Sequence, residues 1–181
     1  NDTHPAIAGP ELIRLLVDGH GMAFDPAREI AQKVLGYTNH TLLPEALERW
    51  STYLVGTVLP RHMQIIEQID HWHLDEHHSR PHWVGIVKNH EVRMGELAFI
   101  MSHKVNGVSA LHTELVKKTL FPELDALHPG RIVNQTNGVT PRRWLRMANP
   151  ALSRLITLRL AIRSSTTLRR CRARSGELVG S

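Results

Sequence analysis

The chain has 181 residues, of which 41% are hydrophobic and 22% charged, a composition typical of a globular protein and not of a disordered or fibrous one. It contains no apolar run of the roughly 18–20 residues that a membrane-spanning helix needs, so no membrane partner is expected. No basic-then-apolar leader stands at the front, and the single cysteine cannot form an internal disulfide. These features indicate a cytoplasmic location.

The net charge of +5 is concentrated at the end of the chain. Residues 161–181 hold five arginines and one glutamate, together with the only cysteine, Cys171. This basic segment lacks interleaved aromatic residues, which nucleic-acid-binding surfaces commonly use for base stacking. We therefore expect no nucleic-acid partner and consider the tail separately from the body.

In chain order, the first two helices are predicted over residues 10–18 and 24–36. The first places leucines on one face after a proline at its start. The second has strong end signals, with Asp25 as N-cap, Pro26 in the first turn and Gly36 as the stop. Both read as amphipathic helices that cover a core.

Further helices are predicted by the same signals, in the order 44–50, 62–76, 93–103, 109–121 and 140–145. The segment 104–109 (KVNGVS) is predicted to be a tight loop, because it contains Asn-Gly and precedes a helix capped by Ser109. The segment 131–139 is predicted to be a short strand that ends in another Asn-Gly turn.

Four loops are rich in Asn, Thr, His and Gly, namely NDTHP, YTNHT, KVNGVS and NQTNGV. Short polar side chains of this kind offer directional donors and acceptors to sugar hydroxyls, and binding residues concentrate in loops on a rigid scaffold. For any single loop, capping and turning the chain is the commoner explanation. Four such loops together favour a sugar site.

The stretch DHWHLDEHH contains His73, Glu76 and His77 in the H-x-x-E-H pattern of inverted zinc proteases. His at i and i+4 share a helix face, and a Glu between them can act as a general base. A chain with 13 histidines produces such matches by chance, and no third ligand stands at a set spacing. We therefore expect no metal.

Four long motifs resemble the α-glucan phosphorylases (glycogen, starch and maltodextrin phosphorylases). They are NDTHP, YTNHTLLPEALERW, MSHKVNGVSALHTELVKKTLF and NQTNGVTPRRWL, and their order and spacing also match over residues 1 to about 160. The resemblance implies an α/β fold of two Rossmann-like domains across a cleft (GT-B type), of which this segment would be a mostly helical piece. It also implies release of glucose 1-phosphate from an α-1,4-glucan with inorganic phosphate.

The resemblance further implies a homodimer and the cofactor pyridoxal phosphate, bound as a Schiff base. The lysine that would hold it lies outside this sequence, so we expect the 181-residue chain to be inactive alone. The catalytic residues carried over are His40 and Asn137, which would hydrogen-bond the 6-hydroxyl of the transferred glucose. The substrate-binding residues carried over are Asp2, His4, Glu45, Ala46, Asn106, Gly107 and Val108.

By this resemblance, residues 1–138 would form the C-terminal part of the N-terminal catalytic domain, and residues 139–160 would form the start of the C-terminal cofactor domain. The likeness ends near Leu160. Codons can be chosen for the start of the tail that, when translated in another reading frame, encode a sequence closer to that of the family. We interpret residues 161–181 as the product of a frameshift.

The alternative to a phosphorylase fragment is a noncatalytic glucan-binding fragment. A piece of a larger domain is also expected to leave apolar faces uncovered, such as those of the 92–103 and 109–121 helices.

Overall fold

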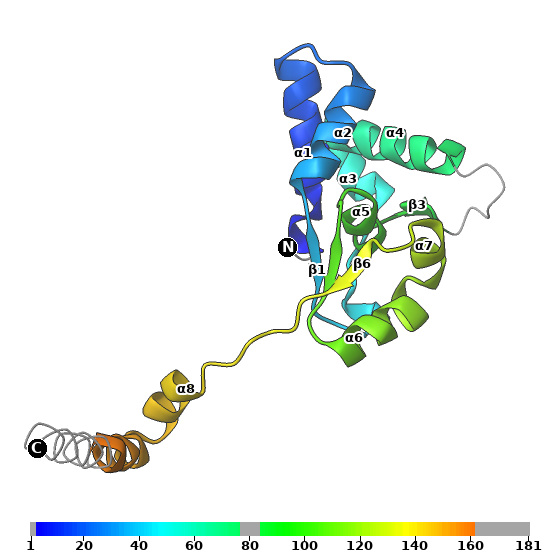
Figure 1. Ribbon diagram of the computed structural model, residues 1–181. Helices are drawn as coiled ribbons and strands as arrows, with labels where there is room; N and C mark the ends of the chain where they lie inside the picture. Colours follow the sequence, from blue (N-terminus) through cyan, green and yellow to red (C-terminus); the bar gives the residue numbers. More distant parts are fainter. Residues whose placement is uncertain (1–2, 77–83, 162–181) are drawn as a thin grey trace, which may run out of the picture. The chain divides into compact units, whose positions relative to one another are not determined.

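The computed structural model describes residues 3–76 and 84–161, and the chain divides into two compact units, Asn1–Asn137 and Gly138–Ser181 (Figure 1). The helices of the first unit include two short 3-10 turns, η1 and η3, and two π-helical turns, η2 and η5. In chain order they are η1 His4–Ile7, α1 Ala8–Arg14, η2 Leu15–Gly19, α2 Phe24–Val34, η3 Pro44–Ala46, α3 Thr52–Val58, α4 Pro60–Glu76, α5 Met94–Ile100, α6 Ala110–Leu115, η5 Val116–Leu120 and α7 Pro122–Leu127.

A three-stranded parallel sheet organises the first unit, with β1 Tyr37–Asn39, β5 Val105–Gly107 and β6 Ile132–Asn134 in the order β1-β5-β6. Its register pairs Asn39 with Gly107 and Gly107 with Asn134. All three strands therefore end at the same edge. Because successive strands are parallel and joined through helices, the sheet has the local pattern of an α/β fold.

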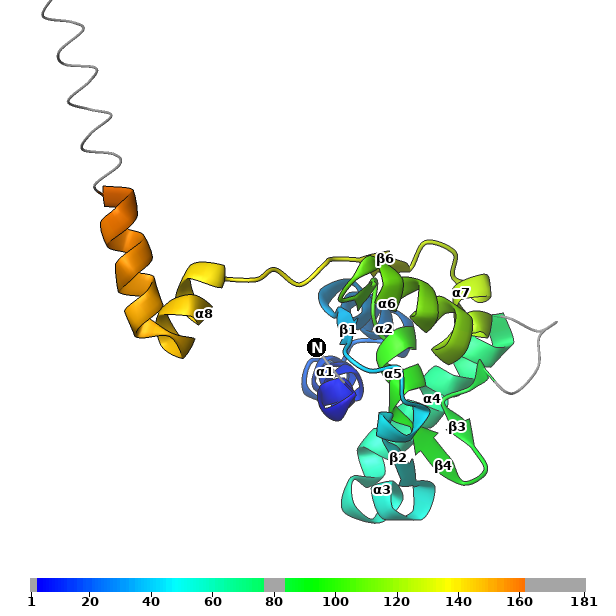
Figure 2. The same ribbon diagram turned by 90° about the horizontal axis from the view of Figure 1, so that it is seen from below.

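A second, antiparallel sheet has the order β2-β4-β3, with β2 Arg49–Ser51, β3 Val87–Lys88 and β4 Glu91–Arg93. Strand β4 leads directly into α5, whose seven residues are all buried. Helix α1 packs on α2 and α4, and α3 packs on α4, so these four form a group beside the sheets (Figures 1 and 2). The fold is thus a mixed α/β arrangement in which helix predominates.

Aromatic side chains meet in the core of the first unit. The rings of Phe99 and Phe121 are 5.3 Å apart, and Tyr37 meets Phe121 edge-on at 6.4 Å. Tyr37 begins β1 and Phe99 belongs to α5. This cluster ties the start of the parallel sheet to the buried helix.

Several predicted elements are wrong in detail. Residues 44–50, predicted as a helix, form the short turn η3 followed by strand β2, because Arg49–Ser51 pairs with β4. The predicted tight loop 104–109 contains β5, and the YTNHT loop contains β1. Asp25 does not cap its helix, since α2 begins at Phe24 after Ala23 and ends at Val34, two residues before Gly36.

Other predictions are confirmed. The strand expected within 131–139 is β6. Ser109 caps α6, its Oγ accepting the amide hydrogen of His112 at 3.1 Å.

The prediction that the helix at 92–103 has an uncovered apolar face is wrong, because all residues of α5 are buried.

The described part of the second unit consists of helix α8, Pro141–Ala148, and a further helix over residues 150–161. Thr140 stands at the N-cap of α8 and Pro141 at its first position, as predicted, although the Thr140 side chain makes no capping hydrogen bond. No helix in the described ranges is long and apolar enough to cross a membrane. The interpreted frameshift falls on 161–181, of which all but the first residue lies outside the described residues.

Candidate active site at the carboxyl edge of the parallel sheet

The carboxyl edge of the β1-β5-β6 sheet brings together three of the polar loops. His40 and Val108 directly follow the paired residues Asn39 and Gly107, so they occupy equivalent positions at the ends of neighbouring strands. The Asn137 amide donates to the Val108 carbonyl at 2.9 Å, which continues the β5–β6 pairing past the strand ends. Ligands of open α/β sheets bind outside the carboxyl ends of the strands.

Gln135 fixes the exit of β6 on β5. Its backbone N–H lies 2.7 Å from Asn106 Oδ1 and 3.1 Å from the Gly107 carbonyl. Asn106 was expected to shape a turn, but in the structure its side chain ties two strands together. The first part of the loop that carries Asn137 is therefore held on β5.

Gly107 permits an unusually close approach of α6 to the sheet. A Cβ at this position would lie 2.2 Å from Thr113 Oγ1 and 2.8 Å from Thr113 Cα, so only glycine fits. Thr113 Oγ1 in turn lies 2.7 Å from the Ser109 carbonyl and 3.1 Å from Asn134 Oδ1. Helix α6 is thereby packed on β5 and β6 (Figure 2).

Asn39 anchors the end of β1 and is fully buried. Its Nδ2 donates to Tyr37 Oη at 2.9 Å, while its Oδ1 accepts from the Thr41 amide at 3.2 Å and lies 3.0 Å from His112 Nε2. His40, by contrast, is exposed. His40 is thus exposed to solvent directly after a buried, hydrogen-bonded residue.

The remaining expected substrate residues lie in two other segments. His4, exposed on η1, places its Nδ1 2.9 Å from Glu48 Oε1. Glu45 and Ala46 are exposed on η3, three and two residues before Glu48. Asp2 lies outside the described residues. The His4–Glu48 contact therefore connects the NDTHP segment with the segment that follows η3.

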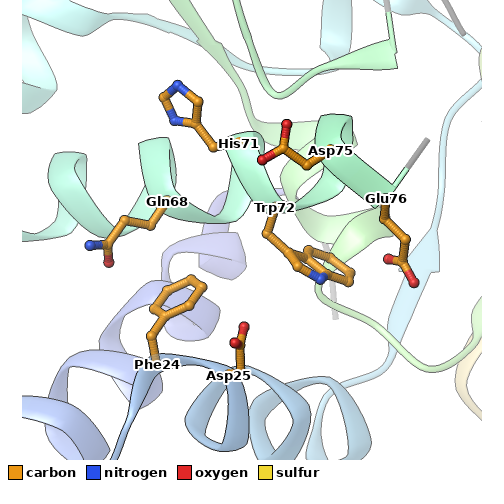
Figure 3. Close-up of a pocket in the computed structure, with 7 residues that line it drawn as sticks. All are labelled: Phe24, Asp25, Gln68, His71, Trp72, Asp75 and Glu76. Atoms are coloured by element: carbon orange, nitrogen blue, oxygen red, sulfur yellow. The ribbon is translucent and has the colours of Figure 1, made fainter. Parts of the chain in front are cut away.

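The residues of the zinc-like motif are divided between the core and the surface. His73 is fully buried, with its ring 5.6 Å from that of His128. Glu76 lines an open depression of about 670 Å³ between α2 and α4, together with Phe24, Asp25, Gln68, His71, Trp72 and Asp75 (Figure 3). His77 lies outside the described residues. His73 and Glu76 do not meet at a common site.

Comparison with known proteins shows the family of this chain. The model of the carbohydrate phosphorylase family matches residues 1–173. The chain belongs to the carbohydrate phosphorylase family. The match extends past Leu160, where the likeness was expected to end, and into the basic tail.

Curated relatives of this phosphorylase chain come from plants, bacteria and animals. The cytosolic α-glucan phosphorylase 2 of Arabidopsis thaliana is 45% identical over 168 residues, covering 87% of this chain and 20% of the relative. The glycogen phosphorylase of Synechocystis sp. is 46% identical over 170 residues, with 88% and 20% covered. The liver glycogen phosphorylase of Ovis aries is 45% identical over 166 residues, with 86% and 20% covered. The chain spans about a fifth of the length of these relatives.

The carboxyl edge of this phosphorylase chain suits neutral hydroxyl groups better than phosphate. The segments 39–41, 106–109 and 134–137 contain amide, hydroxyl and imidazole groups but no Lys or Arg. Lys104 lies at the opposite end of β5, where its Nζ donates to the Gly130 carbonyl at 2.8 Å. Pyridoxal phosphate carries an anionic phosphate that needs cationic or free amide donors. The residues of this edge do not fit that cofactor.

Sequence reasoning missed two residues that organise the site, Glu48 and His112. Glu48 lies in the segment 44–50, which was predicted to be a helix and instead forms η3 and β2. His112 stands within the SALHTE segment, and the cap by Ser109 was the one local signal that α6 starts there. The partners of both side chains are more than 40 residues away in the chain, at His4 and Asn39.

Proposed function

We propose that this chain is the part of an α-1,4-glucan phosphorylase that binds the transferred glucose. The full-length enzyme would have two Rossmann-like domains and would release glucose 1-phosphate from glycogen or maltodextrin with inorganic phosphate. The observation that carries the proposal is the convergence of His40, Val108 and Asn137 at one edge of a parallel sheet. The names of the relatives, glycogen and α-glucan phosphorylases, support the same reaction. The cytosolic relative supports a cytoplasmic location.

In this proposal the imidazole of His40 and the amide of Asn137 hydrogen-bond the 6-hydroxyl of the transferred glucose. The backbone of Val108 lies beside the same hydroxyl, and the backbone of His40 lies near the anomeric carbon, where positive charge develops. His4, Glu45 and Ala46 line the pocket beside the scissile bond, together with Asp2. Directional hydrogen bonds of this kind hold the ring in the reactive orientation and exclude substrates that lack the hydroxyl.

The groups for phosphate and cofactor would come from the remainder of the polypeptide. We therefore propose that the 181-residue chain lacks phosphorolysis by itself, that its first 138 residues belong to the N-terminal catalytic domain, and that the full-length protein uses pyridoxal phosphate and forms a homodimer. Incubation of the purified chain with glycogen, phosphate and pyridoxal phosphate should release no glucose 1-phosphate.

The direct test is a full-length hybrid in which residues 1–160 replace the matching segment of the Synechocystis glycogen phosphorylase. The hybrid should release glucose 1-phosphate from maltodextrin. His40→Ala and Asn137→Ala should each lower kcat/KM roughly tenfold or more, the usual cost of a lost substrate hydrogen bond. His20→Ala, at an exposed residue that directly follows η2, is the matched control and should leave the rate unchanged. A folded hybrid without phosphorolysis would contradict the proposal.

The alternative, a noncatalytic glucan-binding piece, has a specific observation in its favour: the carboxyl edge is assembled within residues 37–137 alone. Calorimetric titration of the isolated chain with maltodextrin separates the two. Millimolar affinity that disappears in Asn137→Ala would favour a binding role for the separate chain.

A further inference from the structure

Asn39 has one amide orientation that satisfies all of its neighbours. Tyr37 Oη is 2.9 Å from Nδ2, so the amide nitrogen donates on that side. Oδ1 then faces the other way and accepts from the Thr41 amide at 3.2 Å. Because Asn39 is fully buried, these contacts hold the backbone at the end of β1.

His112 completes this network from α6. Its Nε2 lies 3.0 Å from Asn39 Oδ1 and 3.2 Å from the Asn39 carbonyl oxygen. Both oxygens are acceptors, so Nε2 must carry the hydrogen, which it shares between them. One imidazole therefore holds the side chain and the main chain of the same residue.

The backbone that carries this imidazole is itself held in place. The amide of His112 donates to Ser109 Oγ at 3.1 Å, and the next residue, Thr113, packs against Gly107. The helix that carries His112 is thus seated on β5 and β6, while its ring reaches β1. It connects the ends of all three strands at the edge where His40 begins the next loop.

We propose that His112 is a positioning residue, which orients His40 toward the transferred glucose by clamping Asn39. This inference rests on the proposed function. It assigns His112 no contact with substrate. Its effect on activity should therefore pass through His40.

The test compares His112→Gln with His112→Asn in the full-length hybrid. A glutamine amide nitrogen can reach the position of Nε2, whereas that of asparagine is one carbon shorter and falls near Nδ1. We expect H112Q to keep kcat/KM for maltodextrin within about threefold of the parent and H112N to lose about tenfold. Leu111→Ala, at a side chain 72% exposed on the same helix, is the control and should change nothing.

A double-mutant cycle with His40→Ala shows whether the effect passes through His40. In the H40A background, H112N should cost less than about twofold, because the residue it positions is gone. An equal loss in both backgrounds, or H112N matching L111A, would overturn the positioning role while leaving the proposed function intact.

Hydrogen exchange measured by mass spectrometry on residues 37–43 of the same proteins gives a readout that does not need activity. H112N should increase deuterium uptake in this segment, and H112Q and L111A should not. An inactive but folded parent hybrid would refute the proposed function, and the exchange data would still decide the positioning role. Unchanged deuterium uptake in H112N would refute the positioning role.

Discussion

At the scale of single residues, Asp70 is a side chain whose charge the fold disfavours. It lies on α4, 8% exposed, and its Oδ1 accepts the Ile86 amide at 2.5 Å. Burial raises the pKa of Asp70 above its ordinary 3.8, against the opposing effect of the Ile86 and Val87 amides. The folded state therefore holds the proton more tightly than the unfolded state. This contribution to stability is complete below pH 3.8 and is lost as pH rises through the raised pKa.

Asp70→Asn should remove this pH dependence and keep the acceptor for Ile86. We expect the urea midpoint of the wild type, relative to D70N, to fall as pH rises above 3.8 and then level off. Glu96, whose pKa burial also raises, is present in both proteins, so the difference isolates Asp70. Asp70→Ala also removes the acceptor and should cost about 1–3 kcal/mol at every pH. Parallel curves for the wild type and D70N would contradict the assignment.

At the scale of elements, helices were predictable because their signals are local. Apolar periodicity over 24–36 and 62–76 and the Ser109 cap locate α2, α4 and α6 to within a few residues. The strands β1 and β5 were missed because each has only three residues, with Asn-containing sequences typical of loops. Their pairing joins segments more than 60 residues apart, so no local pattern reports it.

The contact between α6 and β5 leaves no room for a Cβ at Gly107. Gly107→Ala would drive a methyl group into Thr113, whose Cα would lie 2.8 Å away, and a backbone contact cannot rotate aside. Overpacking of this kind costs about 1–3 kcal/mol. Urea denaturation should show that loss for G107A. Gly19→Ala is the control, since a Cβ there meets nothing within 4 Å. Equal midpoints for the two variants would show that α6 shifts without cost.

At the scale of the whole molecule, the sequence predicts a candidate site but not the contacts that support it. His40, Val108 and Asn137 could be chosen because whole motifs resembled a family, and the sheet register shows why residues so far apart reach one edge. His112 and Glu48 could not be chosen, because the side chain of each contacts a residue that is distant in the chain. A one-residue contact leaves no periodicity or spacing in the sequence.

The second unit should dominate the solution behaviour of the separate chain. Within its described part, residues 138–161, the large apolar side chains that are more than a third exposed are Val139, Trp144, Met147, Leu152, Leu155, Ile156, Leu158 and Leu160. Exposed apolar surface of this extent drives association, because its removal from water is favourable at about 25 cal/mol per Å². We therefore expect the 181-residue chain to self-associate at micromolar concentrations, as measured by sedimentation velocity.

Replacing Met147, Leu155 and Leu158 together by Gln should shift the sedimentation coefficient toward that of the monomer. Replacing Val34, Leu43 and Leu111, three similarly exposed residues of the first unit, gives a matched control that should still associate. The two triple variants remove similar apolar surface, so a difference between them identifies the second unit as the source of association. A wild-type chain that sediments as a monomer at every concentration would show instead that these helices cover one another in solution.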